Sequence, residues 1–279
     1  MKSMVKTWLA GAALGLVLPG ALLNAAVMRR EAPQETVEQS VEEDAGIHLP
    51  VLVREDSGRV QEMDMDAYLT GVVRGEMPAS FDTEALKAQA VAARTYARKT
   101  YVTGGKHGDG SVCKNPGCCQ AYVEEQAYLE GGGTAEGAEK IRAAVADTSG
   151  FVLTYGGELI EATYFSCSGG STEDAAAVWG TDYPYLQAVD SPGEEKAARY
   201  QRTVTFTADE FQQALGVELE GTPDTWFHDT SFTQGGGVAA MGIGGQSYTG
   251  TQLRSRLGLD STAFTVESSP SLERSWVPV

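Results

Sequence analysis

The stretch Glu84-Ala-Leu-Lys87-Ala-Gln-Ala-Val-Ala-Ala-Arg94-Thr-Tyr96 contains the clearest structural signal in the chain. Alanine, leucine and lysine are strong helix formers, so the stretch predicts a helix over about 83–101. Its many small side chains indicate that this helix packs closely against another element. Lys87 and Arg94 are seven residues apart and share one face of the helix.

A shorter helix is expected directly before it, over about 66–75. Asp66 is a suitable N-cap, and Pro78 ends the helix because proline lacks an amide hydrogen. Tyr68 and Glu76 are two i, i+4 steps apart, so Glu76 leaves the helix near its end. Upstream, His48–Val53 and residues 58–64 have the pattern of two strands joined by a turn.

Further elements are expected on the C-terminal side of these helices. Residues 104–120 read as an irregular loop, and the rest of the chain as a series of short elements. In chain order these are a helix over 137–147, a β-hairpin of Phe151–Tyr155 and Glu158–Ser166 joined by Gly156-Gly157, a capping box of Thr207 and Glu210, a glycine-rich stretch over 235–245, and a helix over 250–257 closed by Gly258.

Four segments are expected along the chain. Residues 1–30 resemble a signal anchor, since about twenty apolar residues follow Lys2 and Lys6, enough to span a bilayer. The alternative is a signal peptide cleaved near Asn24-Ala25-Ala26. Residues 31–47 form an acidic linker, 48–267 the folded region and 268–279 a loose tail.

The net charge of −17 argues against one class of partner. A surface this acidic repels phosphate backbones, so nucleic acid is not expected to bind. The net charge does not argue against binding of a neutral polymer such as a glycan.

Glu76 is the strongest candidate for acid–base chemistry. Apolar neighbours on both sides would desolvate its carboxyl group and favour the protonated form that a general acid needs at neutral pH. A surface carboxylate is the alternative. Lys87 and Arg94 interrupt an alanine-rich face and could bind a ligand near Glu76, or they could simply be solvated cations.

Three of the four cysteines lie within seven positions. His107, Cys113 and Cys119 have the spacing H-x5-C-x5-C, and two thiolates with an imidazole suit zinc. A disulfide between Cys113 and either Cys118 or Cys119 is the alternative in an oxidising compartment.

Residues 164–173 contain a strand that leads into a turn rich in glycine and hydroxyl groups. Tyr164, Ser166 and Ser168 beside open backbone suit a wall that binds sugar, although an ordinary polar turn has the same composition. The segment contains no Gly-x-Ser-x-Gly motif, so it does not indicate a serine hydrolase.

Together these segments resemble the SpoIID/LytB family of sporulating bacteria. The resemblance is carried by Tyr68–Pro78, Glu84–Tyr96, Tyr164–Glu173 and Thr249–Phe264, and it extends over about 50–267. It implies an α+β fold, in which helices and β-hairpins form a curved domain with a glycan-binding groove.

The resemblance also implies an activity and a setting. Family members are lytic transglycosylases that cleave the β-1,4 bond between N-acetylmuramic acid and N-acetylglucosamine and leave 1,6-anhydro ends. The chain would act on septal peptidoglycan during engulfment, from the mother-cell side of the sporulation septum, with a single membrane span. Stage II sporulation proteins P and M are the implied partners, and glycan strands, including strands stripped of stem peptides, are the substrate.

The family's catalytic glutamate falls on Glu76, and its glycan-site cations fall on Lys87 and Arg94. Some members hold a zinc ion through one histidine and two cysteines, which fall here on His107, Cys113 and Cys119. The fourth ligand stays open between water, Cys118 and Cys167. Two rival functions also stay open, a glycan-binding enhancer of a partner amidase and a scaffold of the engulfment complex.

Overall fold

The computed structural model describes residues 40–43, 50–197, 200–268 and 275–277. Within these ranges no helix is both long enough and apolar enough to cross a membrane. The anchor predicted at 1–30 and most of the predicted acidic linker lie outside the described residues.

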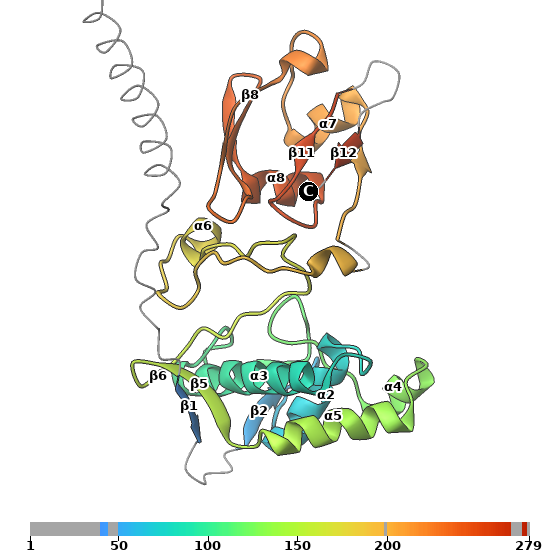
Figure 1. Ribbon diagram of the computed structural model, residues 1–279, viewed down its shortest axis with the longest axis vertical. Coiled ribbons are helices and arrows are strands. Elements are labelled where there is room, and N and C mark those ends of the chain that lie inside the picture. Colours follow the sequence, from blue (N-terminus) through green and yellow to red (C-terminus); the bar gives the residue numbers. More distant parts are fainter. Residues whose placement is uncertain (1–39, 44–49, 198–199, 269–274, 278–279) are drawn as a thin grey trace, which may run out of the picture. The chain divides into compact units, whose positions relative to one another are not determined.

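Three helices form a first hydrophobic core. Helix α2 spans Met65–Glu76, α3 spans Thr83–Thr103 and α5 spans Ala135–Asp147. The three helices pack against one another in pairs, as Figure 1 shows. Their buried side chains include Leu69, Val72, Leu86, Ala90 and Ile141. All three helices were predicted, and their observed ends differ from the predicted ones by a few residues.

Aspartates start both α2 and α3. Asp64 accepts a hydrogen bond from the Ala67 N–H at 2.9 Å, and Asp82 accepts one from the Glu84 N–H at 3.1 Å. The prediction that Asp66 is the N-cap was therefore wrong by one half-turn. Asp66 lies in the first turn of α2, where its carboxylate pairs with Arg94 instead.

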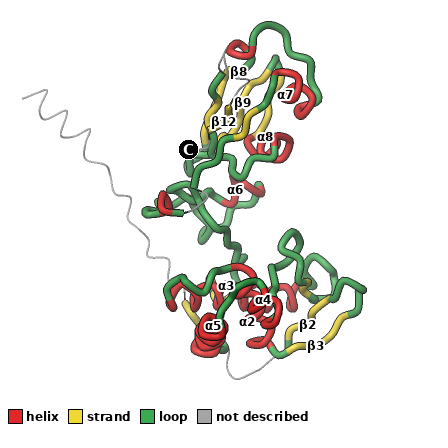
Figure 2. The backbone as a smooth tube through the Cα atoms, turned by 90° about the vertical axis from the view of Figure 1, so that its right-hand side faces the viewer, coloured by secondary structure: helices red, strands yellow, loops and turns green. Residues whose placement is uncertain are grey.

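Two small sheets contact α3. In the first, β2 (Val51–Arg54) pairs antiparallel with β3 (Val60–Met63), as predicted, and parallel with β4 (Val112–Cys113). Figure 2 shows β2 and β3 beside the helices. In the second sheet β5 (Phe151–Tyr155) lies between β1 (Ser40–Glu43) and β6 (Glu158–Leu159).

The predicted hairpin of β5 and β6 is present but short. Gly156 and Gly157 have φ values of 59° and 81°, the positive values that favour glycine in such a turn. The second strand ends at Leu159 and not at Ser166, because the chain then leaves the sheet and carries Tyr164 to Glu76.

A second hydrophobic core lies in the C-terminal part of the chain. An antiparallel sheet has the order β10-β9-β8, with β8 at Phe227–Phe232, β9 at Val238–Ile243 and β10 at Gln246–Thr249. Helices α7 (Ala208–Leu215) and α8 (Gly250–Leu257) share its core. The capping box before α7 and the glycine end of α8 are confirmed. The glycine-rich stretch over 235–245 contains β9, which the sequence did not predict.

The remaining elements are short. They are α4 (Glu125–Glu130), α6 (Ala175–Trp179), the 3-10 helices Glu194–Lys196 and Pro223–Thr225, and the strands β7 (Val204–Thr205), β11 (Thr265–Val266) and β12 (Ser275–Val277). Strand β1 lies within the predicted linker and β12 within the predicted tail. The mixture of helices and largely antiparallel sheets confirms the α+β class. The glycan-binding groove stays a prediction.

Candidate functional site

Glu76 is the last residue of α2 and is half-buried. Its Oε1 accepts a hydrogen bond from the Ala121 backbone N–H at 2.7 Å and a longer one from the Tyr164 hydroxyl at 3.4 Å. The structure thus brings together two of the predicted site residues, Glu76 and Tyr164, from segments 88 positions apart. The Ala121 amide is a third member of this site.

Two glycines allow α2 to approach the segment that carries Ala121. A Cβ atom on Gly75 would lie 2.9 Å from the Tyr122 backbone nitrogen, and one on Gly71 would lie 2.2 Å from the Tyr122 ring. The Val123 N–H also donates to the Gly71 carbonyl at 2.9 Å. The hydrogen bond from Ala121 to Glu76 therefore depends on the absence of side chains on this face of α2.

We expect Gly75→Ala to reduce the activity that depends on Glu76 more than it reduces stability. The added methyl group would push back the backbone of Ala121 and Tyr122, whereas alanine favours a helix over glycine by about 1 kcal/mol. The steric cost and the gain in helix propensity partly cancel in the free energy of folding. The Ala121 N–H nevertheless stays displaced from Glu76. Thermal unfolding measured beside activity checks this, and full activity with an intact fold would contradict it.

Gln120 links Tyr164 to the rest of the core. Its side chain is 1% exposed. The amide Nε2 donates to the Tyr164 hydroxyl oxygen at 3.0 Å and to the Ala93 carbonyl at 3.4 Å, and its Oε1 accepts from the Tyr68 hydroxyl at 3.1 Å. Burial, and then the negative charge of Glu76, raise the pKa of Tyr164 well above its ordinary value. Tyr164 therefore stays protonated and can donate to Glu76.

Arg94 lies away from Glu76. Its guanidinium pairs with Asp66 at 3.0 Å and donates to the carbonyls of Thr148 and Val145 at the end of α5. Asp66 and Glu76 are ten residues apart on α2, so about 15 Å of helix separates them. The structure therefore does not bring Arg94 into contact with Glu76, and its charge stabilises the C-terminus of α5 instead.

Lys87 lies at the same end of α5. Its ammonium group is 3.1 Å from the Asp147 carboxylate and 3.2 Å from the Glu84 carboxylate. The hydrogen bond from Lys87 to Asp147, followed by the one to Glu84, raises the pKa of the lysine. The structure therefore groups Lys87 with Arg94 and does not bring either cation to Glu76.

We expect Arg94→Met to destabilise the protein by about 2–3 kcal/mol, because it leaves the Asp66 carboxylate without its ion-pair partner and removes the buried hydrogen bonds to the Thr148 and Val145 carbonyls. Lys87→Met is the matched control, since it removes a cation from the same face of α3 but only two ion pairs with exposed carboxylates, those of Glu84 and Asp147. Urea unfolding of both variants measures the difference. Equal stabilities would contradict the structural role of Arg94.

His107, Cys113, Cys118 and Cys119 form a cluster whose possible ligand atoms all lie within 4.8 Å of one another. Cys118 Sγ is 3.8 Å from His107 Nε2 and 3.8 Å from Cys119 Sγ, and Cys119 Sγ is 3.6 Å from His107 Nε2. Zinc with bonds of about 2.3 Å to sulfur separates tetrahedral ligands by about 3.8 Å. The four side chains therefore fit a tetrahedral metal site, and the four cysteines form no disulfide.

The pKa values of the thiols also favour binding of a metal cation at this cluster. Burial opposes ionisation of Cys113, but hydrogen bonds from the Asn115 backbone and from His107 outweigh it and lower the pKa of this thiol to about 7. A hydrogen bond to Cys113, followed by burial, raises the pKa of Cys118 to about 11. One thiolate therefore forms readily near neutral pH, and a second one needs a positive charge among the ligands.

Comparison with known proteins places the chain in a family. The family model of the stage II sporulation protein SpoIID matches residues 54–155. Stage II sporulation protein D of Bacillus amyloliquefaciens is 37% identical over 262 residues, which cover 89% of this chain and 75% of that protein. The chain belongs to the SpoIID family.

Two further proteins are similar to the chain. Stage II sporulation protein D of Bacillus subtilis (strain 168) is 40% identical over 222 residues, or 78% of this chain. The chain spans 64% of the length of that relative. An amidase enhancer of the same organism is 41% identical over 120 residues, which cover 43% of this chain and 14% of that protein.

In this SpoIID-family chain the residues of the predicted sugar-binding wall differ in exposure and in their hydrogen bonds. Ser166 is exposed, whereas the backbone N–H groups of Ser168 and Gly169 both donate to the Glu194 carboxylate. Cys167 lies beside the same carboxylate, so it is not the fourth member of the cysteine cluster. Burial opposes ionisation of Glu194, but hydrogen bonds from Ser191 and Ser168 lower its pKa to about 2.

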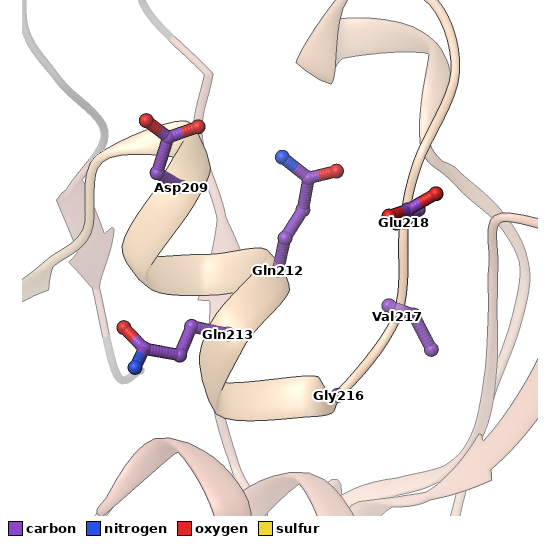
Figure 3. A pocket seen from close by; sticks show the side chains of 6 residues that line it. All are labelled: Asp209, Gln212, Gln213, Gly216, Val217 and Glu218. Atoms are coloured by element: carbon purple, nitrogen blue, oxygen red, sulfur yellow. The ribbon is translucent and has the colours of Figure 1, made fainter.

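The C-terminal part of the SpoIID-family chain has a surface recess of its own. Its volume is about 690 Å³. Figure 3 shows the residues that line it, on α7 and the segment that follows: Asp209, Gln212, Gln213, Gly216, Val217 and Glu218. None of the predicted site residues lines this recess. It therefore does not extend the Glu76 site.

Sequence reasoning missed Gln120 and the Ala121 amide. Gln120 follows the Cys118-Cys119 pair directly, in a segment that was interpreted as irregular loop. The only signal for it was this neighbourhood, since a single glutamine in a polar loop has no pattern of its own. A backbone amide has no signal in the sequence at all.

Proposed function

We propose that the chain is a peptidoglycan lytic transglycosylase, with Glu76 as its single acid and base. The observation that carries the proposal is the geometry of the carboxylate. Glu76 is half-buried at a helix end, and both hydrogen bonds that it accepts from the described residues go to one oxygen, Oε1. A fixed carboxyl group with one oxygen left for substrate is what proton transfer to a bound sugar requires.

The reaction needs only one carboxyl group because the nucleophile belongs to the substrate. Glu76, protonated, gives its proton to the glycosidic oxygen as the bond to the muramic C1 breaks. The resulting carboxylate takes the proton of the muramic 6-hydroxyl as that oxygen bonds to C1. Glu76 ends protonated again, no water is consumed, and the product carries a 1,6-anhydro end. Ordinary glycosidases use two carboxyl groups instead.

The remaining substrate contacts are proposed from the segment that carries Tyr164. Ser166 is exposed on this segment and can offer its hydroxyl to a sugar. Ser168 is proposed to shape this wall, because its amide and its hydroxyl both bond the Glu194 carboxylate. Lys87 and Arg94 are not part of this proposal, because their charges are used at the end of α5.

A zinc ion is proposed at the cysteine cluster, held by His107, Cys113, Cys118 and Cys119. Four protein ligands would leave no open position for a catalytic water, so the ion would supply structure rather than reaction chemistry. Cys118 and Cys119 are followed directly by Gln120 and Ala121, which hold Tyr164 and Glu76. The ligand cluster therefore fixes one end of the segment that positions the carboxylate.

The setting is proposed from the family. The chain would be anchored in the cell membrane by residues 1–30, with its catalytic region outside the cytoplasm on the mother-cell side of the sporulation septum. Stage II sporulation proteins P and M are its proposed partners in engulfment, and glycan strands, including strands stripped of stem peptides, are its proposed substrate.

The amidase enhancer supports a second candidate function. A SpoIID-family chain could bind glycan strands and raise the activity of a partner amidase without cutting the strands. This role needs a sugar-binding surface but no acid–base residue, so it leaves the fixation of Glu76 unexplained.

Digestion of purified glycan strands separates the two functions. The full-length chain in detergent is incubated with strands that carry stem peptides and with strands that lack them, and the products are analysed by mass spectrometry. A transglycosylase produces fragments one water lighter than hydrolysis products. Strands that are bound and recovered uncut would support the binding role and reject the enzymatic one.

A further inference from the structure

We infer that Gln120 is a positioning residue that directs the Tyr164 hydroxyl proton onto Glu76 Oε1 and leaves Oε2 as the oxygen that transfers protons. The inference rests on the proposed function for its catalytic meaning. Its structural content, the direction of one hydrogen bond, stands on the contacts alone.

The orientation of the Gln120 amide follows from its neighbours. The Ala93 carbonyl oxygen can only accept a hydrogen bond, and it lies 3.4 Å from one end of the amide, so that end must be the nitrogen. The other end then is the oxygen, and it accepts from the Tyr68 hydroxyl at 3.1 Å. Both contacts agree on one orientation of the buried side chain.

The orientation of the amide determines that of the tyrosine. The same Nε2 lies 3.0 Å from the Tyr164 hydroxyl oxygen, and an amide nitrogen can only donate. Tyr164 therefore accepts from Gln120, and its single proton remains available for another acceptor. That acceptor is Glu76 Oε1, at 3.4 Å.

The two oxygens of Glu76 thus have different surroundings. Oε1 accepts from the Tyr164 hydroxyl and from the Ala121 nitrogen, which lies 2.7 Å from it. A proton on Oε1 would therefore point toward the hydrogens of two donors. A proton on Oε2 meets no such conflict. The proton that reaches the glycosidic oxygen therefore leaves from Oε2, and the 6-hydroxyl proton returns to Oε2.

A double-mutant cycle tests whether Gln120 acts through Tyr164. The variants are Gln120→Met, Gln120→Glu, Tyr164→Phe and the two combinations, with Gln126→Met on the exposed surface of α4 as the matched control. Methionine removes the donor, and glutamate keeps the shape but offers an acceptor. Each single change at Gln120 or Tyr164 is expected to lower kcat about tenfold with little change in glycan binding, and Gln126→Met is expected to leave kcat unchanged.

The decisive result is the lack of additivity. In the Tyr164→Phe background, neither change at Gln120 should lower kcat further, because the hydroxyl that it orients is gone. Equal losses in both backgrounds would overturn the inference, and so would a rise in KM with unchanged kcat. Metal content and thermal unfolding are measured for each variant, because Cys118 and Cys119 are adjacent to Gln120.

A titration by NMR keeps this test separate from the proposed function. The carboxyl resonance of labelled Glu76 is followed against pH in the wild type, Tyr164→Phe and Gln120→Met. A donor to a carboxylate favours its charged form, so both changes should move the titration of Glu76 to higher pH, by similar amounts. A titration unmoved by Gln120→Met overturns the inference even if the wild type cleaves glycan. Absence of cleavage with the expected titrations would reject only the enzymatic function.

Discussion

Glu76→Gln is expected to lower glycan cleavage by a factor of about 10² to 10⁴ and to leave glycan binding almost unchanged. Glutamine keeps the size of the side chain, and its oxygen can still accept from the Ala121 N–H. It cannot give up a proton to the glycosidic oxygen or accept one from the 6-hydroxyl. The loss should therefore appear in kcat, measured from the release of anhydro ends.

The matched control is Glu84→Gln, which makes the same chemical change at an exposed position in the first turn of α3. It should cleave at the wild-type rate. Turnover of Glu76→Gln close to that of the wild type would show that the acid–base group lies elsewhere. A loss of binding with an unchanged kcat would place Glu76 among the residues that hold the sugar.

Removal of the proposed zinc is expected to cost several kcal/mol of stability, since structural zinc sites hold their fold through the metal. Protein purified without added metal should contain one zinc per chain, and Cys118→Ser should reduce this content. Cys167→Ser is the control, because Cys167 lies beside Glu194 outside the cluster. Metal analysis measures the zinc content, and thermal unfolding before and after treatment with a chelator measures the loss of stability.

Two outcomes would contradict this prediction. Zinc-free protein with a disulfide from Cys113 to Cys118 or Cys119, found by mass spectrometry, would replace the metal by a covalent bond. Full zinc binding in Cys118→Ser would leave three ligands and a water, the arrangement typical of a catalytic site. Glycan cleavage would then have to be retested with the metal removed and the fold intact.

The helical core could be predicted from the sequence because its signals are local. Alanine content and a terminal proline each act within one turn, and α2 and α3 follow from such signals, although the aspartate that caps α2 is Asp64 and not Asp66. The hairpin at Gly156-Gly157 and the capping box at Thr207 are local in the same sense. Strand β9 was missed because its alanines and glycines have no clear alternation.

The candidate site was harder to predict, because its contacts join distant segments. Glu76, Tyr164 and the cysteine cluster could be named as candidates, since these residue types carry chemistry of their own, and their roles stay predictions. The contacts of Arg94 could not be predicted, because a cation on a small-residue face has the same pattern whether it binds a ligand or a helix end. The choice depends on Asp66, 28 positions away, and a single sequence does not contain that information.

The segment from Cys118 to Ala121 has a consequence for how relatives of this chain can diverge. Four consecutive residues carry two members of the cysteine cluster, the amide that orients Tyr164 and the N–H that holds Glu76. One inserted residue would shift the chain by up to about 3.5 Å, more than a hydrogen bond can absorb. Insertions and deletions between these positions would separate the cluster from the carboxylate, so we expect relatives to differ in side chains around them and to keep the length of this segment.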